Sequence, residues 1–287
     1  MTGQRKGALF IVIASIFAAM TTLIAKILGT GETALSPFQI TWGRYTFAMM
    51  ALAIFYFVRR PKFEPLHIPL HLGRVAFGVS GVTAMFAAAT LIPLADATAI
   101  SFLNPMFAMA FAALMLRERV GPVRWFMAAL ALIGALFLIR PGATSFQPAG
   151  LIALLAALLI GIEATFVKAL SGREPVFQIL LMSNLVGSTL CMVLMIWFWQ
   201  WPMFEQWLLL IAIGLAMLSA QSLYVPALRM GDASFVMPFS YITLVFAALY
   251  DLVLFGVIPV PLSLFGCVII IVSGVILAWR DGKAKAQ

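Results

Sequence analysis

Long apolar runs, separated by short clusters of charge, glycine and proline, extend over the whole chain. The stretch Ala128–Ile139 (AALALIGALFLI) is continuously apolar, so it lacks the alternation of apolar and polar residues that a membrane β-strand shows. Continuous runs predict helices, because a segment in lipid has to satisfy its own backbone hydrogen bonds. The pattern predicts ten helices, over residues 7–27, 37–58, 74–91, 95–116, 122–140, 149–169, 176–199, 205–225, 233–254 and 262–279.

Composition places these helices in a membrane. The 287 residues are 64% hydrophobic and 10% charged, whereas a soluble domain is about half apolar and a quarter charged. The first apolar run begins after Arg5 and Lys6 and continues to about Ile24, which is long for a signal peptide, so we expect a retained first span. The sequence therefore predicts an all-α, multi-pass protein of a bacterial-type inner membrane, in contact with lipid and without a separate soluble domain.

The net charge of +8 fits a membrane orientation better than nucleic-acid binding, because basic residues collect in the loops of one side. If the N-terminus is cytoplasmic, the opposite side holds Lys26 and Arg140 alone. The cytoplasmic side then holds Arg5, Lys6, Arg59, Arg60, Lys62, Arg74, Arg117, Arg119, Arg124, Lys168, Arg173, Arg229, Arg280, Lys283 and Lys285. This bias predicts that both termini are cytoplasmic.

Three pairs of polar markers recur in the same order, about 140 residues apart. They are Lys26 with Lys168, Asp96 with Asp232, and Arg140 with Arg280. Each half contains five predicted helices, an odd number, so the second half enters the membrane from the opposite side. We therefore expect two inverted repeats, residues 1–142 and 143–287, which is a recurrent plan of secondary transporters. Each Asp is also expected to cap the helix that follows it, since its side-chain oxygen can accept from free backbone N–H groups.

The residues from Leu94 to Gly142, LADATAISFLNPMFAMAFAALMLRERVGPVRWFMAALALIGALFLIRPG, resemble the drug/metabolite transporter superfamily, in its EamA-type branch. The second copy, GDASFVMPFSYITLVFAALYDLVLFGVIPVPLSLFGCVIIIVSGVIL, is similar. It has FGVIPVP, with no acid, where the first copy has LRERVGP with one glutamate, and Asp251 could substitute for the missing acid. The segment ALSGREPVFQILLMSNLVG is also similar to a branch that includes S-adenosylmethionine transporters. The resemblance implies ten helices in two five-helix repeats.

The function expected from these patterns is secondary active transport, as an exchanger or a proton-coupled carrier working by alternating access. Its cargo would be a small polar or zwitterionic metabolite, such as an amino acid or S-adenosylmethionine. The alternatives are an exporter of drugs or metabolites with broad specificity, or a membrane scaffold that does not transport. We expect no enzyme activity and no direct use of ATP, because no G-x-S-x-G, H-E-x-x-H or P-loop motif occurs.

Neither a cofactor nor a metal is expected. Cys191 and Cys267 lie inside apolar runs, and Pro69 interrupts the pair His67 and His71, which favours an interfacial loop there. The expected partners are a small-molecule substrate, lipid, and a coupled proton or counter-substrate, and the sequence leaves a monomer or a homodimer open.

Ionisable residues inside spans are the first candidates for substrate contact. Glu163 lies well inside a predicted helix, where it would form a structural ion pair, bind a cationic group of the substrate, or exchange a proton. Arg44 would extend toward the membrane surface, receive a substrate carboxylate in bidentate fashion, or neutralise Glu163. If both face one cavity, the site suits a zwitterion.

Further cavity candidates follow from the resemblance, which implies helices around the symmetry axis of the repeats. They are Asn104 beside Pro105 and its counterparts Ser240 and Tyr241, then Gln221 and Tyr224, and finally Met85, Phe86 and Trp42. For a single methionine or aromatic residue, packing is the alternative role. Asn184 is expected to form a hydrogen bond between helices.

Overall fold

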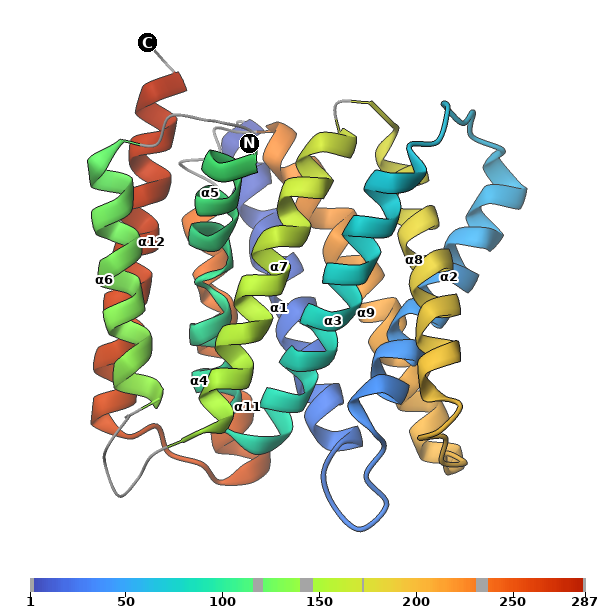
Figure 1. Ribbon diagram of the computed structural model, residues 1–287. Helices are drawn as coiled ribbons and strands as arrows, with labels where there is room; N and C mark the ends of the chain where they lie inside the picture. Colours follow the sequence, from blue (N-terminus) through green and yellow to red (C-terminus); the bar gives the residue numbers. More distant parts are fainter. Residues whose placement is uncertain (1–2, 116–120, 140–146, 172, 231–236, 286–287) are drawn as a thin grey trace.

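The computed structural model describes residues 3–115, 121–139, 147–171, 173–230 and 237–285, and this part of the chain contains helices and no strand (Figure 1). Asp232 and Arg140, two of the repeat markers, lie outside the described residues. The helices are α1 (Gly3–Leu28), α2 (Pro37–Arg59), α3 (Ile68–Leu91), α4 (Leu94–Ser101), α5 (Asn104–Met115), α6 (Pro122–Ile139), α7 (Ala149–Ser171), α8 (Val176–Met195), α9 (Phe204–Met230), the 3-10 helix η1 (Met237–Tyr241), α11 (Ile242–Phe255) and α12 (Pro261–Lys285).

Two of the ten predicted spans are each divided into two helices. The span predicted at 95–116 breaks between Ser101 and Asn104, because Pro105 has no N–H to donate to the Ser101 carbonyl oxygen one turn earlier. In this break the Leu103 N–H binds the Ile100 carbonyl oxygen, at 3.1 Å, in the tighter i to i−3 pattern. The span predicted at 233–254 likewise contains η1, with Pro238, before α11. The prediction of one continuous helix in each place is therefore wrong.

Helix α3 begins at Ile68, six residues before the predicted start at residue 74. Pro69 is compatible with this start, because the first turn of a helix has N–H groups that need no partner inside the helix. The expectation of a loop over His67–His71 is therefore wrong: His67 is the N-cap residue and His71 lies in the helix. The earlier start also brings Arg74 into the second turn, where it is buried.

Pairs of long helices build the bundle. α3 packs along α7, α1 along α9, α2 along α8, and α6 along α12, and Figure 1 shows α6 and α12 together at one edge. Gly134 and Gly266 let α6 and α12 approach closely, since a Cβ on Gly266 would lie 2.6 Å from the Gly134 carbonyl oxygen. Small residues at such contacts are typical of helix packing in membranes.

Length and hydropathy identify membrane spans within this bundle. Among the described residues, five helical segments are long and apolar enough to cross a membrane: Lys6–Leu28, Ile68–Leu91, Ala149–Val167, Val176–Met195 and Phe204–Tyr224. Large apolar side chains also remain exposed on the outer surface, as at Phe57 and Trp197. The start of α1 and the end of α12 lie at the same end of the bundle (Figure 1).

Candidate functional site

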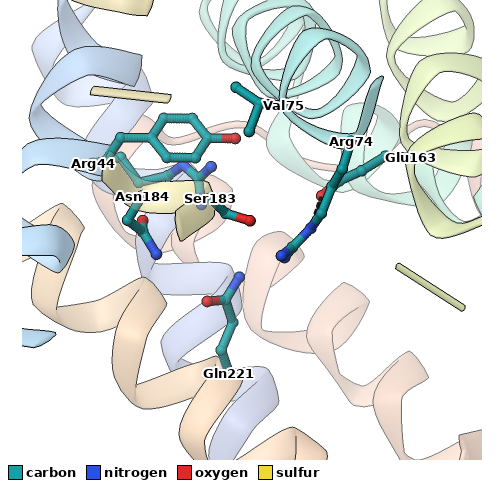
Figure 2. Close-up of a pocket in the computed structure, with 8 residues that line it drawn as sticks. Arg44, Arg74, Val75, Glu163, Ser183, Asn184 and Gln221 are labelled. Carbon is teal, nitrogen blue, oxygen red and sulfur yellow. Dashed lines mark ion pairs between the residues drawn. The ribbon is translucent and has the colours of Figure 1, made fainter. Parts of the chain in front are cut away.

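A polar pocket lies among α2, α3, α7, α8 and α9, away from the ends of the bundle. Its lining residues are Arg44, Tyr45, Arg74, Val75, Glu163, Ser183, Asn184 and Gln221. The cavity among them has a volume of about 20 Å³, far below the roughly 300–1,000 Å³ of small-molecule sites, so the side chains close on one another in this structure and have to separate to admit a substrate. Figure 2 shows the Arg74 guanidinium and the amides of Asn184 and Gln221 pointing into the same space.

Glu163 and Arg74 form an ion pair across the contact between α7 and α3. Arg74 Nε lies 3.5 Å from Glu163 Oε1 (Figure 2), a separation that brings the charges together without a hydrogen bond from Nε. Arg74 Nη1 donates to the Ile179 carbonyl oxygen of α8, at 2.8 Å. The guanidinium is therefore fixed at one corner by the backbone of α8, while its contact with the carboxylate is loose.

The space for the Glu163 carboxylate depends on Gly78 of α3. A Cβ at position 78 would lie 2.9 Å from Glu163 Cδ and 3.0 Å from its Oε1. Any side chain larger than hydrogen would thus displace the carboxylate from its present position. The glycine is needed here for close approach and not for an unusual backbone conformation.

Arg44 of α2 is the second cation of the pocket, and it is only 4% exposed. Its guanidinium carbon lies 3.9 Å from the centre of the Tyr45 ring, a cation–π contact. Its Nε is buried without a hydrogen-bond partner, and no ion pair to Arg44 occurs among the described residues. Arg44 therefore has donor capacity that the protein itself does not use.

Uncharged polar groups from α8 and α9 complete the pocket. The Ser183 hydroxyl donates to the Ile179 carbonyl, and Asn184 Nδ2 donates to the Leu180 carbonyl, both at 2.8 Å. Asn184 thus donates to a carbonyl of its own helix, whereas the sequence predicted a hydrogen bond to a neighbouring helix. Gln221 projects from α9 toward these groups (Figure 2), and together they can orient a polar ligand by hydrogen bonds.

The structure brings Glu163, Arg44 and Gln221 of the predicted site together in this pocket. Trp42 lies elsewhere, in an aromatic cluster with its ring centre 5.6 Å from Trp199 and 6.2 Å from Trp207. The other four candidates do not line the pocket. Met85 packs in an apolar core, and Asn104 lies at the start of α5. Tyr224 packs beside Ile11 and Ala227, and the ring centre of Tyr241 lies 4.7 Å from that of Phe102.

Sequence reasoning missed Arg74, Ser183, Asn184 and Tyr45 as pocket residues. Arg74 was assigned to a cytoplasmic loop because the predicted helix began too late. The signal that could have found it is Pro69, which is favoured in the first helical turn and would have moved the helix start back to Ile68. Ser183 and Asn184 are adjacent polar residues inside an apolar run, a pattern that marks a buried polar face.

A second polar cluster lies at the C-terminal end of α1, where Lys26 forms an ion pair with Asp251 of α11 at 2.9 Å. Asp251 Oδ2 also accepts from the Ala95 N–H at the start of α4. Asp96 is the third residue of α4 and accepts from the Ser263 hydroxyl, at 3.2 Å, while Pro93 is the N-cap residue. The expectation that Asp96 caps this helix is therefore wrong.

The chemistry available in the pocket is ionic recognition. Two guanidinium groups and one carboxylate lie in surroundings with little water, where charge pairing is stronger than in solution. Within the described ranges, no group of three or more His, Cys, Asp or Glu side chains could hold a metal ion. The arrangement can bind and orient a charged small molecule without a covalent step.

Long apolar helices around a buried, charged pocket define a membrane transporter. The model of the EamA-like transporter family matches residues 5–140 and again 147–279, so this chain belongs to that family and is a multi-pass membrane protein. The match confirms the resemblance to the drug/metabolite transporter superfamily.

Several curated relatives are transporters. The chain is 31% identical to a riboflavin transporter of Vibrio cholerae over 76% of this chain and 74% of the relative. It is 25% identical to an S-adenosylmethionine uptake transporter of Rickettsia felis over 92% and 90% of the two chains. The pseudopaline exporter CntI of Pseudomonas aeruginosa is 27% identical over 96% of each.

A solved crystal structure shares the fold. It aligns with a TM-score of 0.63 at 21% identity, covering 96% of this chain and 98% of the other.

Proposed function

We propose that this protein is a secondary active carrier that moves a small charged or zwitterionic metabolite through the pocket around Arg44 and Glu163. The observation that carries the proposal is the combination in one pocket of a buried arginine, which has no ion-pair partner among the described residues, and a partly buried carboxylate. A buried charge without a partner is costly, and a substrate carboxylate would supply the missing partner of Arg44. Glu163 would bind the cationic group of the substrate.

The position of the pocket supports a carrier. Arg44 and Arg74 come from the first half of the chain, and Glu163, Asn184 and Gln221 come from the second half. Substrate sites of secondary transporters lie near the middle of the membrane, where two repeats meet. A site built from both halves changes when the halves move against each other, which is what alternating access requires.

Helix packing supports two related halves. If the first five spans correspond to the last five, the contact of α3 with α7 is equivalent to the contact of α1 with α9. The contact of α5 with α7 is likewise equivalent to the contact of η1 and α11 with α1. The helices at the breaks also correspond, since Pro105 and Pro238 occupy the fourth and ninth spans. The proposal therefore includes two inverted five-helix repeats.

The relatives support transport but differ in cargo and direction, since their names include uptake and export. The last residue of α2, Arg59, and the loop after it, with Arg60 and Lys62, form a basic segment at the end of the bundle where α1 begins (Figure 1). By the positive-inside rule this end is cytoplasmic. The proposed orientation therefore has both termini in the cytoplasm.

Counterflow in proteoliposomes tests the proposal. Vesicles with purified protein are preloaded with an unlabelled compound, and the entry of the same labelled compound is followed for amino acids and for S-adenosylmethionine. The variant Glu163→Gln, which keeps the shape of the side chain but removes its charge, is expected to abolish or uncouple transport while the protein remains folded. Glu205→Gln is the matched control, because Glu205 is an exposed acid outside the pocket.

Accumulation of a labelled compound that fails with Glu163→Gln and persists with Glu205→Gln would support a carrier that uses this pocket. Wild-type counterflow by Glu163→Gln at every pH would contradict the role of the pocket. If the wild-type protein accumulates none of these compounds, the proposed class of cargo is wrong.

A further inference from the structure

The charges that line the pocket do not balance, and this imbalance restricts the cargo. Resting on the proposed function, we infer that the preferred cargo carries two anionic groups and one cationic group, as an amino dicarboxylate does. Such a molecule complements, group for group, the two guanidinium groups of Arg44 and Arg74 and the carboxylate of Glu163. The inference narrows the cargo from zwitterions in general to those with a net negative charge.

The imbalance follows from where the acidic side chains lie. Among the residues that the structure describes, Glu163 is the single acid that lines the pocket, and it faces Arg74. In the described part of the chain, the other two acids that form ion pairs are engaged elsewhere, Asp251 with Lys26 and Glu174 with His67 and His71. With Glu163 ionised, two cations and one anion therefore line the pocket, and its net charge is positive by one.

Arg44 is the group that the protein leaves available. It is almost completely buried, it lines the pocket, and its Nε has no hydrogen-bond partner. A guanidinium presents its N–H groups in a planar fork that matches the two oxygens of a carboxylate. Contact with the Tyr45 ring keeps this group in place. The first anionic group of the cargo thus binds at Arg44.

Arg74 serves as a replaceable partner for Glu163. Its Nε lies 3.5 Å from the carboxylate and forms no hydrogen bond, whereas Nη1 holds the Ile179 carbonyl oxygen at 2.8 Å. A substrate ammonium can therefore take the place of Arg74 at Glu163 while α8 keeps the guanidinium in the pocket. The released N–H groups of Arg74 then receive the second anionic group.

Cargo with a different charge fits less well. A zwitterion of zero net charge leaves one guanidinium without an anion in a poorly hydrated site, which is unfavourable. S-adenosylmethionine, with an ammonium, a sulfonium and one carboxylate, would add a further positive charge. Electrostatic complementarity of this kind discriminates mainly by penalising the wrong partner.

Isosteric pairs of amino acids test the inference, because they differ by one charge at nearly constant shape. Counterflow is measured in proteoliposomes for L-glutamate against L-glutamine and L-aspartate against L-asparagine, with S-adenosylmethionine as the cationic probe. We expect the acidic member of a pair to accumulate about tenfold faster or more, the effect of one charge-assisted hydrogen bond. Arg74→Gln should reduce this preference, because it removes the partner of the second carboxylate.

Arg173→Gln is the matched control, since Arg173 is an exposed arginine outside the pocket. Its preference should equal that of the wild-type protein. If Arg74→Gln does not fold, the comparison within each pair in the wild-type protein still decides the question.

Accumulation of an acidic member in clear preference to its amide supports the inference. Equal or faster accumulation of the amides, or accumulation of S-adenosylmethionine alone, overturns the inference but leaves the carrier function intact. If no probe accumulates, the inference is overturned, and the proposed function is decided separately by counterflow with the wider set of amino acids.

Discussion

Lys26 Nζ lies 2.9 Å from Asp251 Oδ1, and both side chains of this ion pair are almost completely buried. The pair joins α1 to α11, at the end of the bundle opposite the start of α1 (Figure 1). Lys26 also lies 4.5 Å from the centre of the Phe255 ring, and Asp251 also receives the Ala95 N–H. Lys26, which the sequence placed at the end of the first predicted helix, thus links the two halves of the chain.

Removing one partner of this pair should destabilise the protein. Asp251→Asn leaves the Lys26 charge buried without a partner, and breaking a buried ion pair costs about 3–5 kcal/mol in free energy of unfolding. The double variant Lys26→Met with Asp251→Asn should recover most of this loss, because no uncompensated charge remains and Asn still accepts from Ala95. Unfolding in detergent micelles measures both. Equal stability of the single variant and the wild-type protein would contradict the prediction.

Gly78→Ala should impair transport more than folding. The new Cβ would lie 2.9 Å from Glu163 Cδ, and the flexible carboxylate would move rather than the backbone. We expect about a tenfold loss of counterflow, as for one charge-assisted contact, and a loss of stability within the roughly 1–3 kcal/mol of an overpacked site. Gly121→Ala is the control, because no heavy atom lies within 4 Å of a Cβ there. An unchanged transport rate in Gly78→Ala would argue against a role for the carboxylate position.

Acid should weaken the structure through Glu174, which lies between α7 and α8 outside the membrane-spanning helices. Burial raises the pKa of Glu174, but hydrogen bonds from the His67 N–H and from the rings of His71 and His67 outweigh burial and lower the pKa from 4.5 to about 2. The ionised form therefore stabilises the folded state.

This stabilisation is complete above about pH 4.5 and disappears as the pH falls toward 2. The shift corresponds to a free energy of unfolding on the order of 3 kcal/mol. Unfolding of the wild-type protein and of Glu174→Gln should therefore differ at neutral pH and converge near pH 2. A constant difference over this range would contradict the prediction.

Thiol labelling should distinguish the two ends of the bundle. Glu32 follows α1 and Arg173 follows α7, and both are exposed. In a protein whose Cys191 and Cys267 are replaced by alanine, a membrane-impermeant reagent should label Glu32→Cys in intact cells and Arg173→Cys only after permeabilisation. Labelling of both from one side would contradict the proposed inverted repeats, and the reverse pattern would contradict cytoplasmic termini.

The sequence alone was sufficient to predict the class of fold and the approximate spans. Apolar runs set the helices, because lipid excludes any backbone group without a hydrogen bond. The predicted first residues of α2, α6 and α8 agree with the observed ones, since a proline marks each of those boundaries. The breaks at Pro105 and Pro238 were present in the sequence as prolines, but whether a proline kinks a helix or interrupts it depends on the neighbouring helices.

The residues of the candidate site also fall into two groups, those that the sequence could identify and those that only the structure could identify. Glu163 and Arg44 could be singled out from sequence, because a charge inside an apolar run is costly wherever it lies. Their common pocket, and the inclusion of Arg74, Ser183 and Asn184, depended on the rotation of α3 and α8 about their axes, which packing alone decides. Likewise, the sequence showed Lys26 and Asp251 as isolated charges, and only the tertiary structure paired them, because residues far apart in the chain meet where two helices cross.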